Sequence, residues 1–405
     1  MSGRRWGAAA IAMAFVVASA AAPGAAAAQG LPAGGLLWYV DAMKIPAIHD
    51  ADITGDGVTI AVFDAGVNLE VANLRDADIE IRQLDQCPDP TEEAATSFEA
   101  LQHGTSVTSL IVGNGTSDSG TGPVGVAPNA RILYYGALQD SCDGNAFPAA
   151  VADAIAQGAD IVSMSGGSTR LADELSQPSA DAVADALRAG VLVVAGLPNA
   201  DSAWENELGK VNGVVNVASV DAAAQAAPRR DGSPMTNDDV DIVAPGVDMA
   251  GLGWDGTWGM SLWSGNSAAT PIVAGLLALA KEKWPDATAS QLLQSLIRNT
   301  GSTPHELEWT STFGHGIANA TRLVQEDPSQ YPDENPLFTD GQSPTFDEVY
   351  ASNETPTTAA PDAEGGDVSA ALPWFLAGGA TVVVAAVVIV IIMRSRKKSG
   401  GYEHV

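Results

Sequence analysis

Three short segments of the chain place an acid, an imidazole and a hydroxyl in contexts that suit catalysis. Asp64 follows an apolar run typical of a buried strand, and parallel sheets carry their sites at the ends of such strands. His103 precedes an apolar helical run over residues 107–112, and we expect it at the start of that helix. Ser267 begins a second predicted helix, whose dipole would favour a developing oxyanion. We expect Pro271 in the first turn of this helix, where its missing N–H costs least.

Each of the three candidate residues also has a plain structural interpretation when it is taken alone. Asp64 could cap a turn, a single histidine is more often structural than catalytic, and Ser267 could be a helix N-cap. Together they suit nucleophilic catalysis, because a carboxylate can orient a histidine that takes the proton of a serine. Their order along the chain is that of the subtilisin-type triad. The combination favours acyl-transfer chemistry over three unrelated structural roles.

The motifs around these residues resemble those of the subtilisin family of serine peptidases. D-x-G-V, H-G-T and G-x-S-x-A-x-P occur in the family's order, each beside a predicted strand or helix. The resemblance implies a serine endopeptidase that acts on proteins or peptides. It implies that Asp64 holds the tautomer of His103, which deprotonates Ser267. It also implies an oxyanion hole made of an asparagine side chain and the backbone N–H of Ser267.

Asn199 is the residue that the resemblance assigns to the oxyanion hole, because VVAGLPN aligns without a gap with the family's A-A-G-N run. Three nearby positions depart from the family pattern. Pro198 replaces the usual glycine, which fixes φ and removes a backbone donor. Asn266 replaces the usual threonine before the nucleophile, and we expect this change to be tolerated. Ala65 replaces the Thr or Ser that usually follows the catalytic aspartate.

Substrate binding is implied by a further resemblance. The segment Ser165, Gly166 and Gly167 resembles the family's stretch that pairs with the substrate backbone as an added strand. No cofactor is implied. Members of the family often carry structural calcium, but no calcium site can be placed. Residues 50–56 resemble the start of a calcium loop, and Ala61 stands where such a loop needs a glutamate.

The elements that would position these residues alternate between strand and helix. Apolar, β-branched runs predict strands, and patterns of helical period predict helices between them. The strands are expected at residues 58–63, 132–135, 161–164, 191–194 and 214–218, and helices at residues 147–156 and 181–189. Continuous apolar strands separated by helices predict an α/β fold, with an open, doubly wound, mostly parallel sheet covered on both faces.

Both ends of the chain carry apolar segments. Residues 1–28 have the pattern of a secretory signal peptide, with two arginines, an apolar run and an A-x-A cleavage site. Residues 372–393 carry no charge and are long enough to cross a bilayer, and the basic cluster that follows them predicts a cytoplasmic end. We therefore expect a single-pass protein of the cell membrane with its catalytic domain outside the cytoplasm.

Cys87 and Cys142 are the only cysteines, so export predicts a disulfide between them; a reactive thiol pair is the alternative, and no motif supports it.

The sequence as a whole predicts a chain of six segments. The segments are a signal peptide (1–28), a short N-terminal extension (29–44), a peptidase domain (45–325), a Pro- and acid-rich linker (326–371), a transmembrane helix (372–393) and a cytoplasmic tail (394–405).

The net charge of the chain and the order of its segments indicate which kinds of partner it binds. The chain has 49 acidic and 19 basic residues, a formal charge of −30, which disfavours nucleic-acid binding. The start of the domain and the anchored architecture resemble the mycosins, peptidases of actinobacterial type VII secretion systems, which implies a secretion membrane complex as a partner. Two alternatives stay open: a generic cell-surface subtilase, and a scaffold subunit of a secretion complex in which peptidase activity is secondary.

Overall fold

The computed structural model describes residues 35–92, 97–139, 141–166, 176–199, 211–253, 256–301, 303, 305–339 and 344–350. The predicted signal peptide, transmembrane helix and cytoplasmic tail lie outside these residues, as does most of the predicted linker. Within the described ranges, no helix has both the length and the apolar character needed to cross a membrane.

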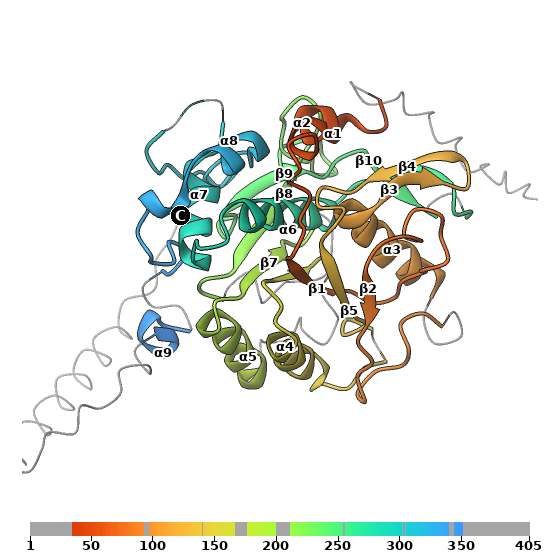
Figure 1. Ribbon diagram of the computed structural model, residues 1–405, viewed down its shortest axis with the longest axis horizontal. Coiled ribbons are helices and arrows are strands. Elements are labelled where there is room, and N and C mark those ends of the chain that lie inside the picture. Colours follow the sequence, from red (N-terminus) through yellow and green to blue (C-terminus); the bar gives the residue numbers. More distant parts are fainter. Residues whose placement is uncertain are drawn as a thin grey trace, which may run out of the picture. The chain divides into compact units, whose positions relative to one another are not determined.

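A seven-stranded sheet forms the centre of the described domain (Figure 1). Its order is β2-β5-β1-β6-β7-β8-β9, and every neighbouring pair is parallel. The strands are β1 (Thr59–Phe63), β2 (Ile79–Ile81), β5 (Arg131–Tyr135), β6 (Ile161–Met164), β7 (Leu192–Gly196), β8 (Val215–Val220) and β9 (Ile242–Pro245). The predicted parallel α/β sheet is thus confirmed.

Alternate residues of the central strands enter hydrophobic cores on opposite faces of the sheet. On β1, Ile60 and Val62 pack with helices α3 (Phe98–Val112) and α6 (Asn266–Lys283). Ala61 and Phe63 pack on the other face, with α4 (Ala146–Ala156) and α5 (Gln177–Arg188). Because successive side chains of a strand point to opposite faces, an apolar run must be covered on both sides, and the helices supply that cover (Figure 1).

The remaining elements surround this three-layer core. The β3–β4 and β10–β11 hairpins each form a two-stranded antiparallel sheet. The elements are α1 (Trp38–Ala42), α2 (Ile45–His49), β3 (Asn114–Ser117), β4 (Gly120–Val124), β10 (Met249–Leu252), β11 (Met260–Trp263), α7 (Ala289–Arg298), α8 (Ala320–Gln325), the 3-10 helix η2 (Pro328–Gln330) and α9 (Phe346–Tyr350).

The N-terminal segment belongs to the folded core, so the prediction of a separate extension over residues 29–44 is wrong for the part that the structure describes. Trp38 and Tyr39 of α1 are buried. The Tyr39 hydroxyl donates to the carbonyl of Val124 and accepts from its N–H, at 2.7 and 2.9 Å. These contacts attach α1 to β4, and the domain therefore begins before residue 45.

The predicted linker also begins too early. Residues 326–339 and 344–350 fold onto the domain, and Val349 of α9 is fully buried. The amide of Asn212 donates to the carbonyls of Thr339 and Pro344, while its oxygen accepts from the N–H of Thr339. Sequence composition missed this segment because polar bonds to distant residues, rather than an apolar stripe, hold much of it. The folded domain therefore extends to α9.

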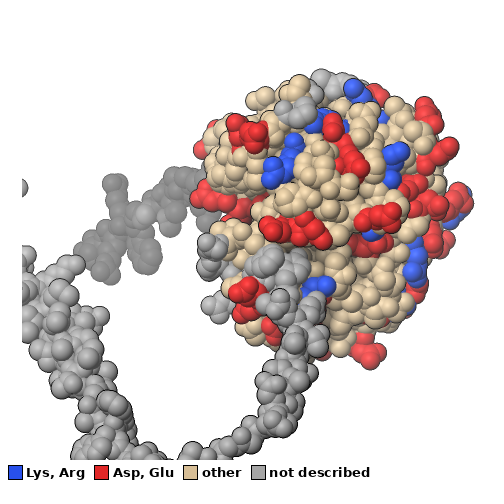
Figure 2. All heavy atoms as spheres, turned by 60° about the vertical axis from the view of Figure 1, so that its left-hand side comes forward, with Lys and Arg blue, Asp and Glu red and all other residues tan. Residues whose placement is uncertain are grey.

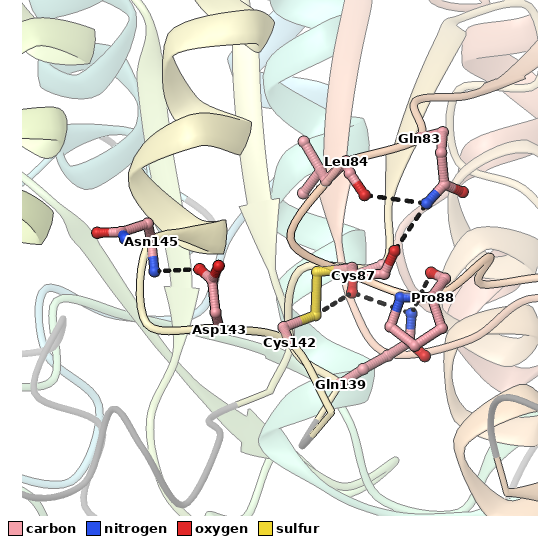
Figure 3. Close-up of a disulfide and its surroundings, with 9 residues drawn as sticks. Gln83, Leu84, Cys87, Pro88, Gln139, Cys142, Asp143 and Asn145 are labelled. Carbon is pink, nitrogen blue, oxygen red and sulfur yellow. Dashed lines mark hydrogen bonds between the residues drawn. A yellow bond between two sulfur atoms is a disulfide. The ribbon is translucent and has the colours of Figure 1, made fainter.

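The structure contains the expected disulfide between Cys87 and Cys142 (Figure 3). It joins the segment after β2 to the turn that precedes α4, two segments separated by 55 positions in the sequence. The side-chain amide of Gln83 donates to the carbonyls of Leu84 and Cys87, and that of Gln139 donates to the carbonyl of Pro88 (Figure 3). These bonds order the backbone on either side of the crosslink.

We expect a Cys87→Ala/Cys142→Ala variant to lose about 4 kcal/mol of unfolding free energy, because the open loop gains entropy in the unfolded chain. Urea unfolding measures this, with parent and variant both carrying Ser267→Ala to prevent the self-cleavage that the sequence motifs predict. Reduced parent protein is the matched control and should unfold with the variant. Equal midpoints for the oxidised parent and the variant would contradict the expectation.

Candidate active site

The candidate residues meet at the edge of the sheet where the parallel strands end. Asp64 directly follows β1, and Ser165 directly follows the neighbouring strand β6. Asn199 lies three residues beyond the end of β7, which pairs with β6. Parallel strands point the same way, so their carboxyl ends gather at one edge and can share one site.

Asp64 and His103 are joined by a hydrogen bond. His103 Nδ1 lies 2.9 Å from Oδ1 and 3.0 Å from Oδ2 of Asp64. The Asp64 carboxylate is buried and also accepts from the N–H of Ala65 at 2.8 Å. The ionised carboxylate can only accept, so Nδ1 carries the proton and the free nitrogen Nε2 is able to act as a base.

The helix that carries His103 begins earlier than the sequence predicts. It starts at Phe98, with the Ser97 hydroxyl accepting from the N–H of Ala100 as an N-cap. His103 therefore lies in the second turn rather than at the helix start. A side chain on Gly104 would collide with the carbonyl of Gly66, which explains why glycine follows His103. This close approach brings α3 against the end of β1.

The pKa of His103 is raised above its ordinary value by opposing effects. Burial is the largest single effect and lowers the pKa. The charge of Asp64, the hydrogen bond to Asp64 and a smaller contribution from Glu99 each raise the pKa, and their sum exceeds the effect of burial. The shift stabilises the fold below the unfolded pKa of the histidine, and this contribution is lost as the pH rises through the folded value. It also stabilises the imidazolium that a general base must form.

Ser267 is the second residue of α6, where the N-terminal end of the helix dipole lies. Trp263, four residues earlier, packs edge-on against the His103 ring with 5.7 Å between ring centroids, so the segment that leads to Ser267 lies beside His103. Ser267 makes no side-chain hydrogen bond among the residues that the structure describes. Sequence analysis did not identify Trp263, because no residue spacing links it to His103.

Pro271 lies inside α6 rather than in its first turn. The helix begins at Asn266, which makes Pro271 its sixth residue. Pro271 has no N–H to donate to the carbonyl of Ser267, four residues before it. The Thr270 hydroxyl adds a bond in the turn before it, because it donates to the carbonyl of Asn266 at 2.8 Å.

Asn199 lies beside the nucleophile segment. Its Oδ1 accepts from the backbone N–H of Asn266 at 2.8 Å. A Cβ placed on Gly265 would lie 3.3 Å from both Oδ1 and Nδ2 of Asn199. Because a backbone N–H can bond only to the oxygen, this contact determines which end of the amide is the NH₂ group. Among the described residues, the NH₂ group is thus the end of this amide that can donate to another partner.

The predicted substrate-binding segment is described only in part. Ser165 is buried and Gly166 is partly exposed at the end of β6, whereas Gly167 lies outside the described residues. Pairing of this segment with substrate stays a prediction. Within the described ranges, no group of three or more His, Cys, Asp or Glu residues is arranged to hold a metal ion.

Comparison with known proteins shows the family of the chain. The model of the subtilase family matches residues 55–316. The chain belongs to this family. The thermostable alkaline protease of Halalkalibacterium halodurans is 30% identical over 298 residues, which cover 71% of this chain and 73% of that relative. Subtilisin BL of Lederbergia lenta is 31% identical over 305 residues, which cover 72% of this chain and 98% of the relative.

Solved structures agree on the fold of this subtilase. The prenylagaramide maturation protease PagA matches with a TM-score of 0.54 and 21% identity, covering 69% of this chain and 97% of that one. Fervidolysin from Fervidobacterium pennivorans, a keratinolytic enzyme, matches with a TM-score of 0.54 and 23% identity, covering 71% of this chain and 45% of that one. Family membership identifies the protein as a subtilisin-type serine endopeptidase.

We expect Asp64→Asn to lower the pKa of His103, because the charge that opposes the burial effect is removed. NMR titration of the histidine ring signals measures this in the Ser267→Ala background, and the other four histidines of the chain serve as internal controls. In the subtilase with an intact serine, the same substitution should reduce turnover about 10⁴-fold. An unchanged His103 pKa would contradict the electrostatic role of Asp64.

Proposed function

We propose that this subtilase cleaves peptide bonds with Asp64, His103 and Ser267 as its catalytic triad. Ser267 Oγ attacks the scissile carbonyl while His103 Nε2 takes its proton. The imidazolium then returns the proton to the leaving amine, and water hydrolyses the acyl-enzyme by the same route in reverse. Asp64 holds the tautomer and stabilises the charged ring throughout. The observation that carries this proposal is the hydrogen bond between buried Asp64 and His103, on a helix beside the segment of Ser267.

The oxyanion of the tetrahedral intermediate would be bound by two donors. One is the side-chain NH₂ of Asn199, and the other is the backbone N–H of Ser267 at the N-terminal end of α6. Supporting this role, the bond from Asn266 to Oδ1 occupies the oxygen of the Asn199 amide. The two proposed donors come from segments that this bond holds together.

Ser267→Ala is expected to abolish most peptidase activity and all labelling by a fluorophosphonate probe, because the probe reacts with the activated hydroxyl. Asn199→Ala should retain the hydroxyl but lose about 10²- to 10³-fold in kcat with little change in KM. Peptide-substrate kinetics and gel-based labelling provide the measurements. Wild-type turnover in Ser267→Ala would refute the assignment of the nucleophile.

We further propose that the enzyme works at the outer surface of a cell membrane, in a mycosin-like role with type VII secretion. The support comes from the sequence: a signal-like segment at residues 1–28, an uncharged run at 372–393, and a basic cluster after it. The protein substrates would then be chains that emerge near a secretion complex.

The extent of the folded domain shortens the linker that would join it to the proposed membrane anchor. Because the domain reaches α9, at most residues 351–371 remain as linker, and a flexible coil of this length averages about 25 Å end to end. Acidic side chains are spread over the face of the domain shown in Figure 2, with fewer basic ones among them. An anionic membrane surface would repel such a face, but only within about 8 Å in physiological salt.

A fragment that ends at Asn353 is expected to retain peptidase activity but to lose the cellular role, since the proposed anchor supplies location rather than chemistry. A matched fragment that ends at Glu326 should fold poorly, because it lacks the buried Val349 and the segment bonded to Asn212. Peptide hydrolysis and complementation of a deletion strain test the two properties. Full complementation by the free fragment would refute the need for an anchor, and complementation by full-length Ser267→Ala would favour a scaffold role.

A further inference from the structure

Asn266, the residue before the proposed nucleophile, bonds to two segments that come from elsewhere in the fold. Its side chain is completely buried. Nδ2 donates to the carbonyls of Leu197 and Pro198, at 2.9 and 3.1 Å. Oδ1 accepts from the hydroxyl of Ser219 on β8 at 2.8 Å. Both donors and the acceptor of one buried amide are therefore used.

These contacts converge on the segment that carries Asn199. Leu197 and Pro198 form the connection from the end of β7 to Asn199, and the Leu197 N–H is bonded to the carbonyl of Val217 on β8. Pro198 has no N–H, so its backbone cannot donate a hydrogen bond to β8 as that of Leu197 does. The amide of Asn266 instead holds this connection through its two carbonyls, while the backbone N–H of Asn266 holds Oδ1 of Asn199.

We infer that Asn266 is a positioning residue for the oxyanion hole, which it serves by clamping the segment that contains Pro198 and orienting Asn199. The inference rests on the proposed role of Asn199. An amide suits this task because it offers two donors and one acceptor in a plane. A threonine hydroxyl, the usual group at this position in the family, has a single donor and cannot bond both carbonyls. The departures at Pro198 and Asn266 are thus complementary.

The effect on the reaction follows from the directionality of oxyanion donors. Such a donor stabilises the transition state only when it is held at hydrogen-bond distance from the position of the developing charge. Displacement of a catalytic group by about 1 Å can cost on the order of 10²-fold in rate. Loss of the hydrogen bonds from Asn266 should therefore reduce kcat and leave KM nearly unchanged, because binding of the remainder of the substrate does not depend on these bonds.

A double-mutant cycle tests the inference. Asn266→Ala and Asn199→Ala are made singly and together, and kcat and KM are measured with one peptide substrate. Asn266→Ala alone should reduce kcat at least about tenfold, but less than Asn199→Ala does. In the Asn199→Ala background it should have almost no further effect, because a positioning residue has nothing left to position. Multiplicative losses in the double variant would overturn the inference.

Folding controls keep the test decisive. Asn266→Ala leaves two buried carbonyls without their donor, which can destabilise the domain, so circular dichroism and active-site titration accompany the kinetics. If this variant does not fold, Asn266→Thr replaces it in the same cycle. Asn266→Thr should reduce kcat in the wild-type background and not in the Asn199→Ala background, and wild-type kcat in the single variant would overturn the inference.

The outcomes separate this inference from the function on which it depends. If Asn199→Ala has normal kcat, the proposed oxyanion role fails and the inference fails with it. If Asn199→Ala is impaired and Asn266 acts independently of it, only the inference fails. Ser219→Ala is the matched control, since it removes the bond to Oδ1 of Asn266 but leaves both donors to the carbonyls. Its loss of kcat should be smaller and should likewise disappear in the Asn199→Ala background.

Discussion

The packing of α6 against the parallel sheet controls the geometry of the whole site. Residues 268–280 of this helix are buried, and it contacts β6, β7, β8 and β9 as well as α3. A shift of a helix enclosed in this way would open voids in a close-packed core, which is energetically costly. The first turn of α6, with Ser267, therefore has a defined position relative to the strand ends that precede Asp64 and Asn199.

Hydrogen bonds also orient two polar side chains of the site. A hydrogen bond made by one end of such a side chain fixes the direction in which its other end points. His103 is held through Nδ1 by Asp64, and Asn199 is held through Oδ1 by the backbone of Asn266. The opposite ends of these two side chains, Nε2 and Nδ2, are the atoms that peptide hydrolysis by the proposed mechanism requires.

The two borders of the domain illustrate different ways of attaching a terminal segment. At the N-terminal side, α1 combines buried aromatic rings with the paired bonds between Tyr39 and Val124. At the C-terminal side, polar contacts such as those of Asn212 return the chain to the domain before α9 buries Val349. The first attachment relies on apolar side chains, and much of the second depends on backbone groups that any residue would supply.

The sequence by itself determined the family, the order of the three motifs, the parallel sheet and the pairing of the two cysteines. Each follows from a local pattern: a run of apolar residues, a short motif, or a count of two. Tertiary structure alone decided that α3 begins at Phe98, that Pro271 lies within α6, that residues 326–339 belong to the domain, and that Asn266 bonds to the segment of Pro198. The last of these joins residues 68 positions apart. The physical reason is that a buried hydrogen bond forms only where the packing of helices and strands brings two distant segments within about 3 Å of each other. The local pattern of residues along the chain does not indicate which distant segments will meet.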